Sequence, residues 1–187
     1  MKWKRLVVAF LLAAGCAVEK TPQEEAPPIA ASPPDTVRGP LRRGIHLPSV
    51  EVLSVDGERR NVRTLVGGKD TIVFFLSTSC DVCTEMLANW TAEEIPEHLN
   101  LFAVVDETVE YGRAFSDREK LPFPVYMDTN HIFLSRWSVN EFPTVAGLRG
   151  DGLIVYARRG VAPELFTPAR AETLLARGKD FYGKADR

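Results

Sequence analysis

The 187-residue sequence predicts an α/β protein: a central mixed β-sheet flanked by helices on both faces, with an N-terminal β-hairpin. Short apolar runs rich in β-branched and aromatic residues, typical of buried strands, alternate with longer amphipathic segments, typical of helices. Near the end of the chain, two more strand-like segments flank a turn and add antiparallel strands to a parallel unit. The length behind the N-terminal segment suffices for one domain of ordinary size.

The N-terminal segment, residues 1–15, has the composition of a signal peptide. Residues 1–5 are cationic, and residues 6–14 form an apolar run of about nine residues, where a membrane span needs about twenty. The run closes in Leu-Ala-Ala-Gly-Cys at residues 12–16, which resembles the lipobox of bacterial lipoproteins. The resemblance implies that the signal is cut before Cys16 and that Cys16 carries the lipid. An ordinary cleaved signal peptide with an incidental Cys16, or an uncleaved anchor, is the alternative.

The segment that follows, residues 16–44, combines the lipidated cysteine with a predicted flexible linker. It is rich in alanine, glutamate and proline and has little that could pack into a core. Its prolines are Pro22, Pro27, Pro28, Pro33, Pro34 and Pro40. We therefore expect a domain at residues 45–187 that is membrane-anchored through the lipid. Its expected location is the cell envelope, on the extracytoplasmic (periplasmic) side.

The first elements of the domain are a hairpin and a buried strand. Residues 50–55 and 60–63 are strand-like and flank the turn pair Asp56-Gly57, which predicts the N-terminal β-hairpin. Residues 71–76 are a continuous run of apolar, β-branched and aromatic side chains. Such a run is typical of a strand covered on both faces, so we expect it in the interior of the sheet.

The remaining elements follow from the same two patterns and from turn residues. Residues 80–97 carry apolar side chains three or four apart, which predicts an amphipathic helix. The other predicted elements are strands at 99–105, 125–127, 144–148 and 153–158, helices at 109–120, 132–139 and 163–182, and a hairpin turn at 149–152.

The residues that carry chemistry are Cys80 and Cys83, directly after a buried strand and at the start of a predicted helix. Free backbone N–H groups and the helix dipole favour an anion there, so Cys80 is the candidate thiolate nucleophile. Cys83 lies about one helical turn further on and is the candidate resolving thiol, which attacks a mixed disulfide. The negative charge of Asp81 opposes part of this thiolate stabilisation.

A family resemblance rests on two segments, Phe-Phe-Leu-Ser-Thr-Ser-Cys-Asp-Val-Cys at residues 74–83 and Glu-Phe-Pro-Thr-Val at residues 141–145. Together they resemble a membrane-anchored thioredoxin-fold protein of the TlpA/ResA type, with redoxin and MauD-like relatives close behind. The resemblance spans about residues 45–180 and implies a thioredoxin-like fold and a thiol-disulfide oxidoreductase that needs no cofactor. It also implies that Pro143 is a cis-proline facing the disulfide, with Phe142, Pro143 and Thr144 binding the substrate main chain.

The sequence departs from that family at four positions. Ser79 replaces the tryptophan usual before the first cysteine, and Val82 replaces the proline usual before the second. Met86 and Phe74 stand where relatives carry acidic groups, although Glu85 is near in sequence. These changes bear on proton transfer, redox potential and the direction of electron flow.

The expected partners follow from the resemblance and from the charge. They are exported protein thiols or disulfides and, for a reductant, a membrane thiol electron donor. The formal net charge is −2 with both signs mixed along the chain, so no basic field for nucleic acid is present. The predicted function is extracytoplasmic thiol-disulfide exchange, by reduction or oxidation of exported protein thiols.

Other interpretations of the cysteine pair remain open. Half of a zinc site would need two more ligands from His46, His98, His131 or carboxylates, and a copper-delivery domain would space its cysteines one residue wider. A purely structural disulfide also suits an exported domain. No metal site is therefore predicted.

Two alternatives concern function. A peroxiredoxin-like peroxidase would place proline and threonine where this chain has Val73 and Ser77. A non-catalytic binding module on a thioredoxin fold would explain the missing tryptophan and proline. Trp90, Trp137 and Phe142 are expected to pack in or near the core, with Trp137 and Phe142 alternatively lining a substrate groove.

Overall fold

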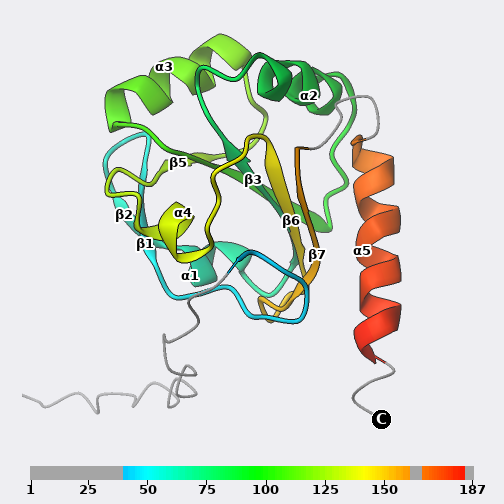
Figure 1. Ribbon diagram of the computed structural model, residues 1–187. Helices are drawn as coiled ribbons and strands as arrows, with labels where there is room; N and C mark the ends of the chain where they lie inside the picture. The colour runs from blue at the N-terminus through cyan, green and yellow to red at the C-terminus, as the bar shows by residue number, and fades with distance from the viewer. Residues whose placement is uncertain (1–39, 161–165, 184–187) are drawn as a thin grey trace, which may run out of the picture. The chain divides into compact units, whose positions relative to one another are not determined.

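The computed structural model describes residues 40–160 and 166–183 and contains one seven-stranded mixed sheet with helices on both faces (Figure 1). The strands are β1 (Glu51–Ser54), β2 (Arg59–Asn61), β3 (Asp70–Leu76), β4 (Leu99–Val105), β5 (Val125–Met127), β6 (Thr144–Leu148) and β7 (Ile154–Arg159). The helices are α1 (Val62–Val66), α2 (Asp81–Ala92), α3 (Val109–Glu119), α4 (Ile132–Arg136) and α5 (Pro168–Gly183).

The strand order is β2-β1-β5-β4-β3-β6-β7. β3 pairs in parallel with β4, and β4 in parallel with β5, while the β1–β2 and β6–β7 hairpins add antiparallel strands at the two sides. The fold is thioredoxin-like, and the predicted mixed sheet with an N-terminal hairpin is confirmed. β3 is an interior strand, as its run of apolar, β-branched and aromatic residues predicts.

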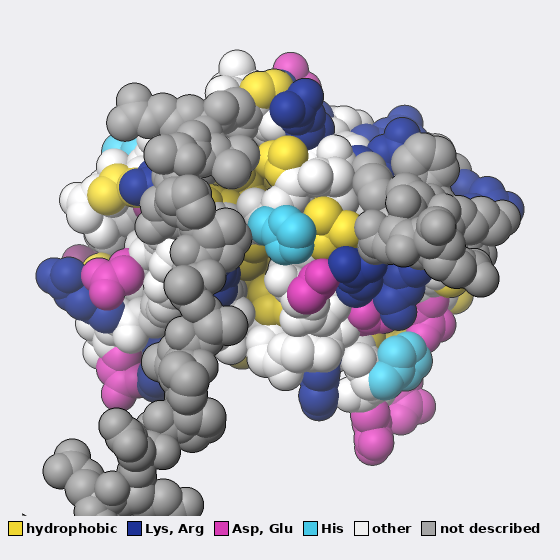
Figure 2. Space-filling view, turned by 90° about the horizontal axis from the view of Figure 1, so that it is seen from below, with side chains coloured by type: hydrophobic (Ala, Val, Ile, Leu, Met, Phe, Trp, Pro, Cys, Tyr) yellow, Lys and Arg dark blue, Asp and Glu magenta, His cyan; other side chains and the backbone are white. Residues whose placement is uncertain are grey.

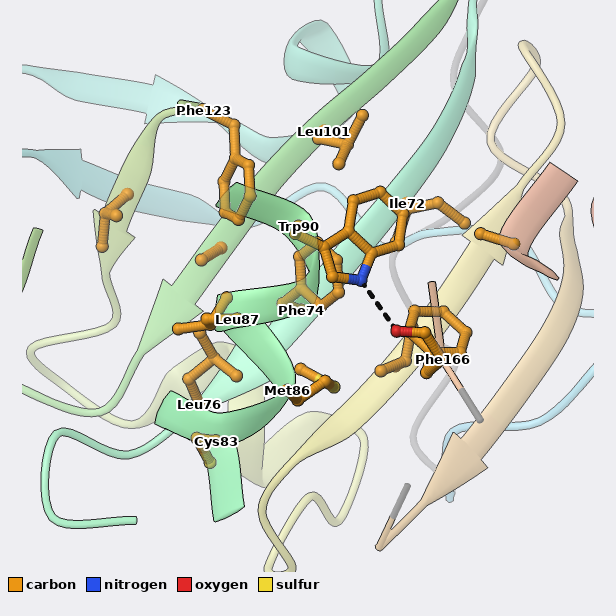
Figure 3. Close-up of a cluster of buried hydrophobic side chains, with 14 of the residues drawn as sticks. Ile72, Phe74, Leu76, Cys83, Met86, Leu87, Trp90, Leu101, Phe123 and Phe166 are labelled. Atoms are coloured by element: carbon orange, nitrogen blue, oxygen red, sulfur yellow. Dashed lines mark hydrogen bonds between the residues drawn. The ribbon is translucent and has the colours of Figure 1, made fainter. Parts of the chain in front are cut away.

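Alternating side chains of β3 supply the two faces of the sheet with separate cores. Phe74 packs in one cluster with buried side chains of α2, α3 and α5, and Phe75 packs in the other with side chains of α1 and α4. In the first cluster, the Trp90 ring meets Phe74 edge-on at 5.0 Å between ring centroids, and Trp90 Nε1 donates to the Phe166 carbonyl at 3.1 Å (Figure 3). This bond ties the segment before α5 to α2.

The predicted strand at residues 60–63 is wrong in its second half. Val62 and Arg63 open α1, because the Asn61 side chain accepts the Arg63 N–H at 3.0 Å and caps a helix there. Val62 is fully buried, so tertiary packing outweighs its preference for a strand.

Several predicted helices are shorter in the structure, since their apolar periodicity continues into the connecting loops. The helix predicted at 80–97 ends at Ala92, and the helix predicted at 132–139 ends at Arg136. The closing helix begins at Pro168, and residues 163–165 of that prediction lie outside the described part of the chain.

The packed chain begins before the predicted boundary at residue 45. Leu41 is buried, and its N–H donates to the Trp137 carbonyl at 2.9 Å. Gly44 N–H donates to the Ile154 carbonyl at 2.8 Å. The predictions for the signal peptide and Cys16 lie outside the described residues. Within residues 40–160 and 166–183, no helix has both the length and the apolar character that a membrane crossing requires.

The ends of the central strands form two opposite sides of the sheet, which are called its active edge and its opposite edge below. The active edge is defined here by the carboxyl ends of β3, β4 and β5, and the opposite edge by the amino ends of β3 and β4 together with the turn between β6 and β7. Where the grey atoms leave it visible, the lower face in Figure 2 has acidic and basic side chains next to one another.

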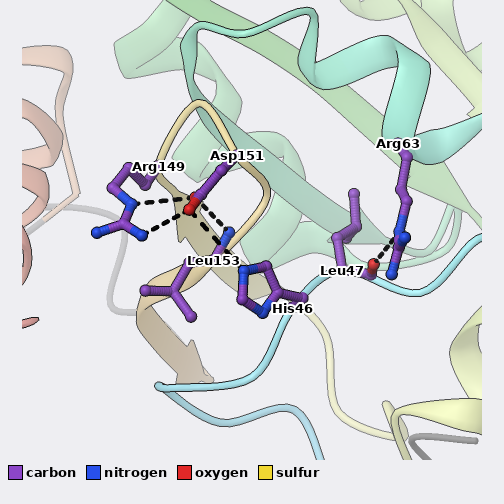
Figure 4. A network of polar contacts seen from close by, with 6 residues as sticks. All are labelled: His46, Leu47, Arg63, Arg149, Asp151 and Leu153. Carbon is purple, nitrogen blue, oxygen red and sulfur yellow. Dashed lines mark hydrogen bonds and ion pairs between the residues drawn. The ribbon is translucent and has the colours of Figure 1, made fainter. Parts of the chain in front are cut away.

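Asp151 is the centre of a polar network at the opposite edge (Figure 4). Its carboxylate accepts from Arg149 Nε at 3.0 Å and from the Leu153 N–H at 3.0 Å, and lies 3.9 Å from His46 Nε2. The hydrogen bond from Arg149, more than any other contact, lowers the pKa of Asp151 to about 2.

Candidate active site

Cys80 and Cys83 lie at the active edge, where the chain leaves β3 and enters α2. Cys80 is the N-cap residue of α2 with extended backbone angles, and its Sγ accepts the Cys83 N–H at 3.1 Å. The N–H group of Cys83 in the first turn of α2 therefore points at Cys80 Sγ, the sulfur atom that the sequence predicts as the nucleophile. Partial positive charge at a helix N-terminus favours the thiolate form of such a sulfur.

The two cysteines form a disulfide with their Cα atoms 5.2 Å apart. Cys83 is fully buried and belongs to the first core cluster, beside Met86 and Leu87 (Figure 3). Cys80 is half-buried and packs against the same cluster from outside. An incoming thiolate therefore reaches Cys80, while Cys83 is reached only from within the protein.

The predicted substrate-binding residues also lie at this edge. Thr144 of β6 pairs with Phe75 of β3, so Pro143 lies beside the carboxyl end of β3 from which the chain continues to Cys80. The Phe142–Pro143 peptide bond is cis, as the resemblance implies. Phe142 is partly buried and contacts both core clusters. Binding of substrate by these residues stays a prediction.

The buried tryptophans and Thr144 have packing roles. Trp90 and Trp137 are fully buried, and Trp137 packs between Phe133 and Phe75. Trp137 therefore does not line an exposed groove in this structure. Thr144 is also buried, and its Oγ1 donates to the Glu141 carbonyl at 2.6 Å, which fixes the segment before β6.

An open pocket of about 520 Å³ adjoins the disulfide and is called the Cys80 pocket below. Its lining residues are Thr78, Cys80, Asp81, Thr84, Glu85, Arg118 and Glu119. Glu85, the acid near Cys83 in sequence, is exposed on this wall. Among the described residues, three carboxylates and one guanidinium group thus line the pocket that Cys80 also lines.

Sequence reasoning missed the residues that hold the loop before Cys80. Thr78 Oγ1 donates to Glu107 Oε1 at 2.6 Å, and Arg118 Nη2 donates to the Thr78 carbonyl at 3.4 Å. Glu107 follows β4, the parallel neighbour of β3. Since the carboxyl ends of parallel strands lie at the same side of a sheet, its position in the sequence could have indicated that it lies near Thr78. Arg118 comes from α3, and no sequence pattern pointed to it.

Asp128, also at the active edge, caps the short helix that leads toward Pro143. Its two carboxylate oxygens accept the N–H groups of Ile132 at 3.0 Å and Leu134 at 2.8 Å. Burial raises the pKa of Asp128, although these backbone hydrogen bonds act in the opposite direction. Its role is to fix α4 against the sheet.

The three histidines each lie near a single carboxylate. His46 is near Asp151, His98 Nε2 is 3.0 Å from Glu172, and His131 Nδ1 contacts Asp106. Within the described ranges, no three histidine, cysteine or acidic side chains come together as a metal site.

The fold and site define a class: a thioredoxin-like thiol-disulfide oxidoreductase whose active-site disulfide joins Cys80 and Cys83. The chain belongs to the AhpC/TSA family, whose model matches residues 44–160. That match includes both cysteines and Pro143. No curated protein sequence matches the chain.

Solved structures with a similar fold include a putative disulfide isomerase, a disulfide oxidoreductase and a peroxidoxin. A putative protein disulfide isomerase from Bacteroides thetaiotaomicron is 19% identical with a TM-score of 0.58, covering 73% of this chain and 87% of its own. The peroxidoxin BcpB from Mycobacterium tuberculosis is 16% identical with a TM-score of 0.60, covering 75% and 97%. A secreted M. tuberculosis disulfide oxidoreductase homologous to E. coli DsbE is 15% identical with a TM-score of 0.52, covering 71% and 96%. At these identities the likeness concerns the fold alone.

Proposed function

We propose that this protein carries out thiol-disulfide exchange with exported protein thiols or disulfides, as a redoxin of the TlpA/ResA type. The observation that carries the proposal is the asymmetry of the pair, with Cys80 half-buried at the N-terminus of α2 and Cys83 fully buried behind it. An attacking thiol and a protected resolving thiol are what a two-step exchange requires.

The exchange balances within the two proteins. The Cys80 thiolate attacks one sulfur of a client disulfide, forms a mixed disulfide and releases one client thiolate. Cys83, as a thiolate, then attacks Cys80 Sγ, so that the Cys80–Cys83 disulfide forms and the second client thiolate leaves. Two electrons pass to the client, whose two thiolates take up the protons that the cysteines lose. The reverse sequence oxidises a client dithiol.

The client is proposed to bind along the chain at Pro143. Phe142 and Pro143 lie beside the end of β3, where an extended client segment would be held next to Cys80. Main-chain pairing of this kind selects an extended cysteine-containing segment more than a particular side chain.

The proposed location is the cell envelope, with the domain lipid-anchored at Cys16 on the periplasmic side. The cationic start, the short apolar run and the lipobox-like residues 12–16 support it. A membrane thiol carrier would be the electron donor if the protein acts as a reductant. Acyl mass on Cys16 in the membrane-extracted protein would support this location, and a mature chain with unmodified Cys16 would contradict the anchor.

The reaction is tested by equilibrating the full-length chain with defined thiol-disulfide buffers and measuring Cys80 and Cys83 by alkylation mass shift. We expect a reversible two-electron couple. A potential near about −270 mV, the thioredoxin value, would indicate a reductant, and one near about −120 mV an oxidant. A pair that resists reduction throughout the range would contradict the proposal and favour a structural disulfide.

Two cysteine variants separate the exchange from its alternatives. Cys83→Ser is expected to accumulate the mixed disulfide on Cys80, because the resolving thiol is missing, whereas Cys80→Ser is expected to form none. Exchange at the wild-type rate in Cys80→Ser would overturn the assignment. A binding module would retain its partner in both variants without a covalent adduct.

A peroxidase is the second candidate, because the peroxidoxin BcpB is among the solved structures with a similar fold. Val73 lies within β3, and Ser77 Oγ lies 3.1 Å from Ser79 Oγ at the position where a peroxidase would carry threonine. We expect hydrogen peroxide to oxidise reduced Cys80 no faster than it oxidises a free thiol of similar acidity. A much faster reaction would move the peroxidase to first place.

A further inference from the structure

Arg118 is the basic side chain of the Cys80 pocket among the residues that the structure describes. It projects from the last turn of α3 and lines the same wall as Cys80. Its side chain is 58% exposed, its Nε donates to Glu119 Oε1 at 2.7 Å, and its Cζ lies 5.4 Å from the centroid of the Phe115 ring. Two contacts on its own helix therefore hold the planar group in one orientation.

The remaining contact of Arg118 crosses to the loop that carries Cys80. Nη2 donates to the carbonyl of Thr78, two residues before Cys80. Glu107 accepts the hydroxyl of the same residue, so Thr78 is held through its backbone and its side chain from two different elements. The N–H of Cys80 in turn donates to the Ser77 carbonyl at 3.2 Å, which closes the loop as a turn.

We infer that Arg118 is a positioning residue for the Cys80 thiolate: it anchors the loop through Thr78 and supplies positive charge that offsets the acidic wall of the pocket. The inference rests on the proposed function, because a thiolate forms only when the disulfide is reduced. Asp81, Glu85 and Glu119 lie around the pocket and disfavour a negative sulfur. Arg118 and the N-terminus of α2 act in the opposite sense.

The sign of the effect follows from charge alone. A nearby cation stabilises the thiolate relative to the thiol, so it lowers the pH at which Cys80 becomes reactive. It also stabilises the reduced protein relative to the disulfide, which makes the pair a stronger oxidant. Since Arg118 is more than half exposed, solvent screens the interaction and the expected effect is modest.

The test measures the alkylation rate of Cys80 against pH in a Cys83→Ser background of the full chain, followed on the peptide that contains Cys80. Arg118→Met keeps much of the apolar stem and removes the charge. We expect the midpoint of the rate profile to rise, so that the rate below the midpoint falls about threefold. Arg118→Lys retains the charge and is expected to recover most of that loss.

Arg113 provides a matched control on the same helix. Its Nε donates to the Val55 carbonyl at 3.0 Å, so it also bonds a loop carbonyl, but it does not line the Cys80 pocket. Arg113→Met makes the same change in net charge and is expected to leave the Cys80 profile unchanged. An equal shift in Arg113→Met would assign the effect to overall charge and overturn the inference.

The outcomes are separable from those of the proposed function. A profile in Arg118→Met that superimposes on its parent, or a loss that Arg118→Lys fails to recover, would overturn the role of the charge. If Arg118→Met does not fold, Glu119→Gln gives the complementary test. This variant removes the negative charge beside Arg118 and is expected to lower the pH midpoint of the Cys80 alkylation profile. A midpoint that stays in place or rises would also overturn the inference. Failure of the wild-type protein to show a reversible couple would contradict the proposed function but leave these profiles measurable.

Discussion

The active edge and the opposite edge share the strands β3 and β4 but differ in how their charged side chains are arranged. At the opposite edge, Arg149 forms an ion pair with Asp151 and Lys179 forms one with Asp70, and His98 lies against Glu172. At the active edge, a half-buried sulfur faces a pocket in which acidic groups outnumber the single described guanidinium.

The difference indicates which parts of the fold contribute to the free energy of unfolding and which affect the reactivity of Cys80. The amino end of β3 is fixed by buried hydroxyl and backbone contacts, while beyond its carboxyl end the loop is held by contacts from α3 and from the segment after β4. We therefore expect changes at the opposite edge to alter the free energy of unfolding and leave Cys80 unaffected. Changes at the active edge should alter Cys80 with less effect on stability.

The largest expected effect is at the opposite edge, for Gly150→Ala. A Cβ atom at residue 150 would lie 2.3 Å from the backbone oxygen of Gly68, and neither backbone can move without disturbing its turn. We expect a loss of about 2–3 kcal/mol in the free energy of unfolding and a fall of roughly 5–10 °C in the melting temperature. Thermal unfolding followed by circular dichroism measures it.

Gly57→Ala is the control for Gly150→Ala. Gly57 has a φ of +82° and open space around the added Cβ, so only backbone strain of about 1 kcal/mol is expected. The redox potential of both variants should equal that of the wild type. A shifted potential in Gly150→Ala would show that the two edges are coupled through β3.

A matched pair of threonines near the two ends of β3 gives the next largest effect. Thr71 is buried, donates to the Lys69 carbonyl at 2.9 Å and accepts from Asn100 Nδ2 at 3.3 Å. Thr71→Val keeps the shape of the side chain and is expected to cost about 1–2 kcal/mol, because buried partners lose their hydrogen bonds. Thr78→Val removes the half-exposed bond to Glu107 and is expected to cost about 1 kcal/mol or less.

The reactivity of Cys80 should show the reverse order. Thr78→Val frees the loop before Cys80 and is expected to change the alkylation rate of reduced Cys80, whereas Thr71→Val should leave that rate at the wild-type value. Urea unfolding and alkylation kinetics on the same preparations measure both properties. Equal effects of the two variants on Cys80 would remove the distinction between the edges.

Those parts of the fold that depend on local pattern were predictable. The interior strands were predicted within one residue, because residues 71–76 and 99–105 consist mainly of apolar, β-branched and aromatic residues, which is typical of a strand covered on both faces. Helix α1 was missed, because a single Asn61 cap outweighs the strand preference of Val62. Cys80 and Cys83 could be placed at a helix start from spacing and position alone.

Long-range contacts account for what was missed at the site. The neighbourhood of Pro143 and the cysteines depends on pairing of β6 with β3, and the sequence indicated it only through the family resemblance. The bond between Arg118 and Thr78 joins residues forty apart in sequence and two different elements. A charged residue near the end of an exposed helix is ordinary, so nothing in the sequence distinguished Arg118 from Arg113.

The smallest expected effect concerns the charge of Asp151 at the opposite edge. The pKa of this carboxyl is lowered from 3.8 to about 2, chiefly by the hydrogen bond from Arg149. The folded state therefore binds the proton less readily than the unfolded state, so the charge stabilises the protein above pH of about 4. This stabilisation is lost as the pH falls through about 2.

Asp151→Asn tests this linkage, since asparagine can still accept the Leu153 N–H that Asp151 Oδ1 accepts at 3.0 Å. The side chain of Asp151 is 46% exposed, so solvent screening limits the expected loss to less than about 1 kcal/mol at pH 7. The difference in melting temperature between wild type and variant should shrink as the pH is lowered from 4 toward 2, because protonated Asp151 resembles the variant. A difference that stays constant over that range would mean that geometry, not charge, holds the β6–β7 turn. An altered redox couple in Asp151→Asn would contradict the separation of the two edges.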